Sequence, residues 1–94
     1  MLNYRSSYKS IDGTMLGAVL DFPGVIAYGE TLEKARESLA SALRDMAETN
    51  LLKGEALPIP DPNATDPDAE LEEPIHLILQ AGQQVSMKVG TAAS

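Results

Sequence analysis

The sequence predicts an α+β domain in which a small antiparallel sheet carries one long helix on a face, in the order β-β-β-α-β. Three observations lead to this class. Short alternating or apolar stretches separated by Asp-Gly and Pro-Gly turns fill the first third of the chain, an amphipathic helical pattern follows, and alternating apolar stretches return after a proline-rich segment. A helix with one apolar stripe and a sheet with one apolar face bury each other, so these elements predict one two-layer unit.

The chain opens with a pattern typical of a hairpin. Residues 2–11 place Tyr4 and Tyr8 on one face of a strand, because side chains two or four positions apart point the same way. Asp12 and Gly13 follow, and this dipeptide suits a tight turn because both residues tolerate positive φ. We therefore expect the next segment to return antiparallel to the first.

Two further strands are predicted before the helix. Residues 14–20, TMLGAVL, are typical of a largely buried strand, in which Gly17 indicates a bulge or a close approach of another element. Pro23 and Gly24 interrupt the apolar run, and residues 24–29 then predict a short third strand. Short connections between three strands favour an antiparallel meander.

A helix is predicted over residues 31–53. Thr31 is a suitable N-cap, Glu33 in the first turn complements the helix dipole, and Lys53 with Gly54 provides a typical C-terminus. Apolar residues recur at intervals of three and four, which predicts one buried stripe. The stripe comprises Leu32, Ala35, Leu39, Ala42, Leu43 and Met46.

The charge of the chain is concentrated after the helix. The net charge is −7, and residues 54–74 hold seven carboxylates and no basic residue, together with five of the six prolines. So many prolines predict an extended loop without a regular element. A field of this sign repels phosphate and attracts basic proteins.

Strand patterns return at the C-terminus. Ile75, Leu77 and Leu79 alternate, and so do Val85, Met87 and Val89; the two runs form either a hairpin or one long bent strand. The sequence predicts a single domain over residues 1–89 and a frayed tail over 90–94. Because the helix covers one sheet face and nothing obvious covers the other, we expect a homodimer through a sheet or strand edge. Val85, Met87 and Val89 are the candidates for that edge.

Composition argues against several classes of protein. The chain has no cysteine and a single histidine, His76, so thiolate sites and histidine-based metal or catalytic clusters cannot form within it. It has no secretory signal and no apolar run of the ~20 residues that a membrane helix needs, so we expect a cytoplasmic protein without membrane contact. The glycines are spaced like turns rather than like a phosphate-binding loop, and no basic or aromatic platform for nucleic acid is present.

Carboxylates offer the only remaining candidates for chemistry. Asp12, Asp21 and Glu30 lie at predicted strand ends, but the hairpin turn accounts for Asp12 and the approach to the helix accounts for Glu30. Of these three carboxylates, Asp21 alone has no obvious structural role in the sequence. The acidic segment has neither the glycine nor the closing glutamate of an EF-hand loop. We therefore expect no catalytic residue, no metal site and no cofactor, and interpret the chain as a binding module rather than an enzyme.

One series of motifs resembles a known family. Asp21-Phe22-Pro23-Gly24, Gly29-Glu30-Thr31, the alanine-containing helix and Gly54 followed by Leu57-Pro58-Ile59-Pro60 appear in the order and spacing of HicB antitoxins and HicB-like proteins. Leu20 stands where that family often has proline. The resemblance covers residues 1 to about 80.

The resemblance implies a partial RNase H-like fold without the metal-binding carboxylates of the nucleases. It also implies a homodimer or larger homo-oligomer that binds a small basic HicA-type toxin, an mRNA endonuclease, and blocks it. Many HicB proteins continue into a DNA-binding domain, whereas this sequence ends at Ser94, so we expect no direct nucleic-acid binding.

Three hypotheses follow for the function. The first is a toxin-binding antitoxin, for which charge complementarity nominates four carboxylates as toxin contacts: Asp68, Glu70, Glu72 and Glu73. The second is a stand-alone oligomeric scaffold or small-molecule-binding module of the same fold. The third is a residual metal-dependent nuclease that uses Asp21.

Overall fold

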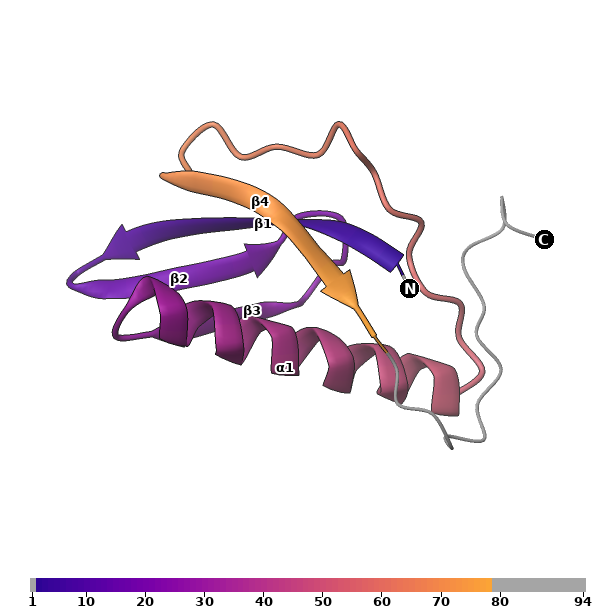
Figure 1. The fold of residues 1–94 in the computed structure, drawn as a ribbon. Helices are drawn as coiled ribbons and strands as arrows, with labels where there is room; N and C mark the ends of the chain where they lie inside the picture. Colours follow the sequence, from indigo (N-terminus) through magenta and orange to yellow (C-terminus); the bar gives the residue numbers. More distant parts are fainter. Residues whose placement is uncertain (1, 79–94) are drawn as a thin grey trace.

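The computed structural model describes residues 2–78, and it confirms the predicted α+β class. The elements follow the order β1 (Leu2–Ile11), β2 (Thr14–Val19), β3 (Ile26–Gly29), α1 (Leu32–Leu52) and β4 (Leu71–Leu77). The strands form one sheet in the order β3-β2-β1-β4, in which all neighbours are antiparallel. Figure 1 shows α1 beneath one face of the sheet, while the loop that leads from α1 to β4 runs over the other. We call these the helix face and the loop face, and residues 55–70 the crossing loop.

The β1–β2 hairpin forms as the Asp-Gly dipeptide predicts. Asp12 and Gly13 have φ of 50° and 81°, and Ile11 pairs directly with Thr14 across the turn. Both φ values lie in the left-handed region that this two-residue connection requires. The hairpin places Tyr8 opposite Gly17, where a Cβ would lie only 3.0 Å from the Tyr8 ring, so the predicted close approach at Gly17 is confirmed.

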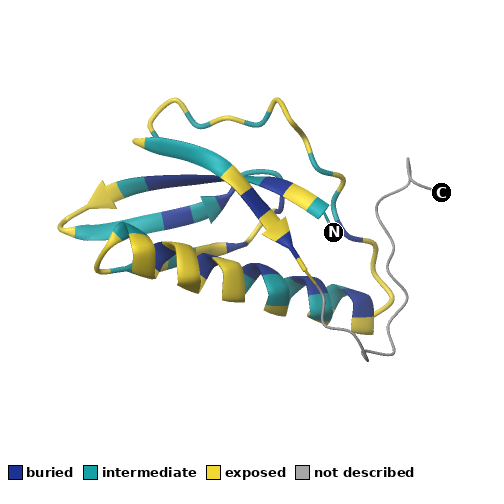
Figure 2. Cartoon of the chain, in the orientation of Figure 1, coloured by how far each residue is buried: buried dark blue, intermediate teal, exposed yellow. Residues whose placement is uncertain are grey.

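Helix α1 matches its prediction closely. The Thr31 hydroxyl accepts a hydrogen bond from the Lys34 amide at 3.1 Å, which caps the N-terminus. At the other end Gly54 has φ of 77° and donates to the Leu51 carbonyl at 3.0 Å, which satisfies one of the last carbonyls. The buried residues recur at intervals of four and face the sheet (Figure 2): Ala35, Leu39, Leu43, Ala47 and Leu51. The predicted stripe is confirmed in part, because its Leu32, Ala42 and Met46 are only partly buried, while Ala47 and Leu51 are not part of it.

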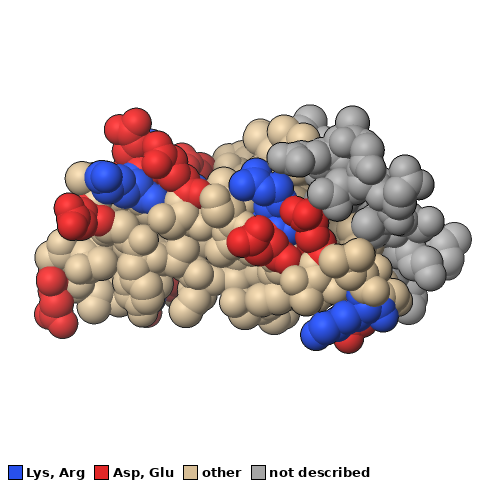
Figure 3. Space-filling model, turned by 90° about the horizontal axis from the view of Figure 1, so that it is seen from below, with Lys and Arg blue, Asp and Glu red and all other residues tan. Residues whose placement is uncertain are grey.

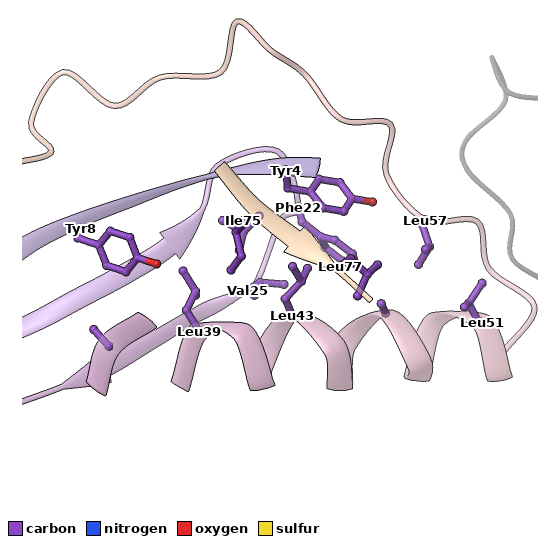
Figure 4. Close-up of a cluster of buried hydrophobic side chains, with 13 residues drawn as sticks. Tyr4, Tyr8, Phe22, Val25, Leu39, Leu43, Leu51, Leu57, Ile75 and Leu77 are labelled. Atoms are coloured by element: carbon purple, nitrogen blue, oxygen red, sulfur yellow. The ribbon is translucent and has the colours of Figure 1, made fainter. Parts of the chain in front are cut away.

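The core lies between α1 and the helix face (Figure 4). Tyr4 and Phe22 pack edge to face with ring centroids 5.4 Å apart, an arrangement that aromatic pairs favour. Ile75 and Leu77 of β4 close the core from the far side of β1, as their alternation predicts. Leu57 joins them from the crossing loop and is completely buried.

The prediction of an irregular segment through residue 74 is wrong at its end. Strand β4 begins at Leu71, which pairs with Tyr8, and continues through Pro74 to Leu77. Proline is tolerated because β4 is the outermost strand, and a proline nitrogen that points away from the neighbouring strand removes no bond from the ladder. The predicted strand over residues 84–89 lies outside the described residues, and so does the choice between a hairpin and one long strand.

The second sheet face is covered over its β1–β4 half, so the expectation that nothing covers it is wrong for that half. Ser6 and Ser7 are adjacent on β1 and point to opposite faces, yet both are buried, with 0% and 4% of their surface exposed. The crossing loop accounts for the burial of Ser7, because it lies over the loop face of β1 and β4 (Figure 1). The β2–β3 half of that face remains open, and its Ile26 and Tyr28 are more than half exposed.

Candidate interaction surface

Asp21 fastens the crossing loop to the sheet. One carboxylate oxygen, Oδ1, accepts the backbone N–H of Arg5 at 2.9 Å, and Oδ2 accepts that of Asp61 at 2.8 Å. Strand β2 ends one residue before the position opposite Arg5, and the Leu20 amide donates to the Arg5 carbonyl at 2.8 Å. The Asp21 carboxylate therefore accepts the N–H that a continued β2 would have bonded. This is the structural role that sequence reasoning did not find.

Glu72 forms a second attachment for the loop. Its Oε1 binds Arg5 Nη2 at 3.1 Å, while its Oε2 accepts the Thr65 hydroxyl at 2.7 Å and the Asp66 amide at 3.2 Å. The hydrogen bond from Thr65, followed by that from Arg5, holds the pKa of Glu72 below its usual value. Asp66 in turn lies 3.5 Å from Lys9 Nζ on the neighbouring strand. Several carboxylates of the crossing loop and of β4 therefore form hydrogen bonds or ion pairs that attach the loop to the sheet.

Glu73 points to the opposite face. It forms a two-pronged ion pair with Arg36 of α1, with distances of 2.7 Å to Nε and 3.0 Å to Nη2. This hydrogen bonding raises the pKa of the Arg36 guanidinium. Because neighbouring residues of a strand alternate between faces, Glu72 ties β4 to the crossing loop while Glu73 ties it to the helix.

Glu70 and Asp68 complete the set of predicted toxin contacts. The Glu70 amide donates to the Tyr8 carbonyl at 2.9 Å, and its Oε2 accepts the Ser10 amide at 2.6 Å, which extends the pairing of β4 with β1. Asp68 is exposed, and within residues 2–78 nothing binds its carboxylate. The four residues therefore do not share one surface, because Glu73 lies across the sheet from Glu72. Their proposed contact with a toxin stays a prediction.

The Leu-Pro-Ile-Pro stretch joins the crossing loop to the core. The Tyr4 hydroxyl donates to the Pro58 carbonyl at 2.7 Å, and Leu57 fills the space beside it. Burial, with a smaller contribution from the charge of Asp21, raises the pKa of Tyr4 to about 12. The phenol consequently remains a hydrogen-bond donor at all ordinary pH values.

Within residues 2–78 no three histidine or acidic side chains gather in a way that could hold a metal ion. His76 is at an exposed position of β4, and its Nδ1 shares a hydrogen bond with the Asn3 side chain. In the described part of the chain no helix is long and apolar enough to cross a membrane. The predicted dimer-edge residues Val85, Met87 and Val89 lie outside the described residues.

The fold and these contacts define a small two-layer α+β domain whose charged clusters join one element to another. The chain belongs to the UPF0150-like family, whose pattern matches residues 4–58. No curated protein matches the sequence.

Two solved structures share the fold. The N-terminal domain of the Burkholderia pseudomallei antitoxin HicB has a TM-score of 0.67 and 20% identity, with 83% of this chain and 100% of that domain covered. The structure of the Burkholderia pseudomallei antitoxin HicB has a TM-score of 0.74 and 22% identity, with 96% of this chain and 70% of that chain covered. The resemblance to HicB proteins that the sequence motifs predict is thereby confirmed in the fold.

Proposed function

We propose that this chain is a non-catalytic antitoxin that binds a small basic toxin of the HicA type and blocks its mRNA endonuclease activity in the cytoplasm. The observation that carries the proposal is the fold shared with the HicB N-terminal domain over the full length of that domain. The proposal includes a homodimer or larger homo-oligomer, and it assigns the chain no cofactor and no nucleic acid.

The distribution of charge supports a basic partner. On the helix side, acidic and basic side chains lie in small mixed groups (Figure 3). The crossing loop and the start of β4 carry seven carboxylates and no basic residue, and of these seven Glu73 points to the helix face. Complementary fields of this kind raise association rates and select partners, so the loop side is where a basic toxin should arrive.

The four predicted toxin contacts, Asp68, Glu70, Glu72 and Glu73, would contribute unequally to the attraction of a basic toxin. Within the described residues nothing binds the Asp68 carboxylate, and Glu70 is exposed, so their charge reaches solvent. The charges of Glu72 and Glu73 are partly offset by Arg5 and Arg36. We therefore assign Asp68 and Glu70 the larger share in attracting the toxin, while Glu72 and Glu73 hold the surface in shape.

The test has two steps: to look for a small basic HicA-type protein encoded beside this chain, and to measure whether the chain binds it. We expect a stable complex on co-expression, with an association rate that falls as salt is raised. The double variant Asp68→Asn with Glu70→Gln should slow association about tenfold at low salt. The matched control is Asp45→Asn with Glu37→Gln on the exposed side of α1, which removes the same charge elsewhere and should leave the rate near that of the wild type. The proposal would be overturned if no neighbouring gene encodes a small basic protein, or if the protein so encoded forms no complex with this chain.

A further inference from the structure

The outer edge of β3 carries unpaired backbone groups. The Val19 amide donates to the Val25 carbonyl at 2.9 Å, and pairs in an antiparallel ladder alternate between hydrogen-bonded and non-hydrogen-bonded. The backbones of Ala27 and Gly29 therefore face β2, while those of Ile26 and Tyr28 face outward. Within residues 2–78 β3 pairs only with β2, and no loop or side chain bonds to these outward groups.

The side chains beside this edge are apolar and exposed. Ile26 and Tyr28 are 55% and 57% exposed on the loop face, where the crossing loop does not reach. Leu16 and Ala18 of β2 lie directly opposite them on the same face. Neither β2 nor β3 contains a charged residue, so these strands carry no charge that would disfavour pairing of another strand with the edge.

The opposite edge of the sheet is protected. Strand β4 carries Glu72 and Glu73, and Pro74 lacks the N–H that an added strand would need. Proline and charge are the devices that keep edge strands from pairing. Of the two edges that the described residues form, β3 is the one open to strand addition.

We propose that β3 pairs antiparallel with β3 of a second copy of this chain, about a two-fold axis through Ala27. This register sets Ile26 of each copy opposite Tyr28 of the other, since the paired residue numbers sum to 54. Each such pair would exchange two backbone hydrogen bonds and would bring a β-branched side chain against an aromatic ring, a favourable cross-strand combination. The inference rests on the homo-oligomer of the proposed function and names the edge that forms it.

The charge distribution favours a second copy in this arrangement. The acidic crossing loop lies over β1 and β4, at the other end of the sheet from β3. Pairing through β3 joins two four-stranded sheets into one and puts the two acidic loops at its outer ends, where their mutual repulsion is smallest. Pairing through β4 would bring the two loops together.

Sedimentation velocity of the full chain over a wide concentration range tests the proposal. Because β3 has only four residues, we expect a reversible dimer that dissociates on dilution. Ile26→Lys and Tyr28→Glu should each raise the dissociation constant about tenfold or more. Ile59→Lys is the matched control, because it adds the same charge at another exposed isoleucine and should change little. Circular dichroism establishes that each variant is folded.

Mixing the two variants tests the register itself. In a heterodimer of Ile26→Lys with Tyr28→Glu, the new lysine faces the new glutamate, and the second site keeps the wild-type pair. The mixture should therefore associate more tightly than either variant alone. A wild-type chain that stays monomeric throughout would overturn both the oligomer and the inference. Two outcomes would overturn the β3 interface alone. One is a dimer that persists in Ile26→Lys but is lost in Val85→Lys, and the other is a mixture of the two variants that associates no more tightly than either variant by itself.

Discussion

The carboxylate of Asp21 joins the amide of Asp61 to the sheet, across 40 residues of sequence, while its other oxygen holds the amide of Arg5. The crossing loop is therefore attached at both ends of its path over the sheet, by Asp21 near its start and by Glu72 where β4 begins. The crossing loop has the composition of a free acidic loop, but it is attached to the sheet and covers part of the loop face.

Removal of the Asp21 carboxylate should destabilise the protein. Two backbone N–H groups lose a charged acceptor in Asp21→Ala, so we expect the free energy of unfolding to fall by about 2 kcal/mol, since hydrogen bonds to charged groups contribute roughly 1.5–3 kcal/mol. Urea denaturation measures the loss, and hydrogen exchange should accelerate selectively at Arg5 and Asp61. Asp68→Ala, which removes a carboxylate that no residue from 2 to 78 binds, is the control. Equal stability of the two variants would contradict the attachment.

The attachment by Glu72 predicts a dependence on pH. Hydrogen bonds from Thr65 and Arg5 depress its folded-state pKa below the unfolded value. Its contribution to stability is therefore present above the unfolded pKa and is lost as the pH falls through the folded pKa. Urea denaturation between pH 7 and pH 3 should show wild type more stable than Glu72→Gln at neutral pH, with the difference shrinking in acid. A difference that is constant with pH would count against this role.

Gly29 should be intolerant of any side chain. A Cβ at this position would lie 2.3 Å from the Ala35 amide nitrogen, and this contact is with helix backbone that cannot turn aside. Gly29→Ala should cost about 1–3 kcal/mol, the usual range for overpacking. A thermal melt should show a fall of several degrees or more. At Gly17 the contact is with the Tyr8 ring, which can shift, so Gly17→Ala should lower stability less than Gly29→Ala does. A larger loss of stability in Gly17→Ala would show that the helix approaches β3 less closely.

Local signals predicted most of the fold. The Asp12-Gly13 turn and the Thr31 cap depend on neighbours within a few residues, and both appear as expected. The helix also forms where its apolar pattern predicts, although the buried stripe includes Ala47 and Leu51 in place of Ala42 and Met46. The start of β4 was missed because Glu72, Glu73 and Pro74 resemble a loop, and only pairing with β1 makes them a strand.

The candidate site was harder to predict because its contacts are long-range. Nothing near Asp21 in the sequence points to Asp61. Once residues 71–77 are known to be a strand, alternation places Glu72 and Glu73 on opposite faces. If residues 71–73 are instead taken as part of a loop, the sequence predicts that Glu72 and Glu73 lie on one acidic surface.

The central claim, that this chain blocks a toxin, is tested most directly by an mRNA cleavage assay with a HicA-type protein encoded beside it, to which the chain is added in increasing amounts. We predict that cleavage falls in proportion to added chain and ceases near equal molar amounts. The activity should return in high salt, where the acidic loop is screened. Undiminished cleavage with the chain in excess at low salt would contradict the account.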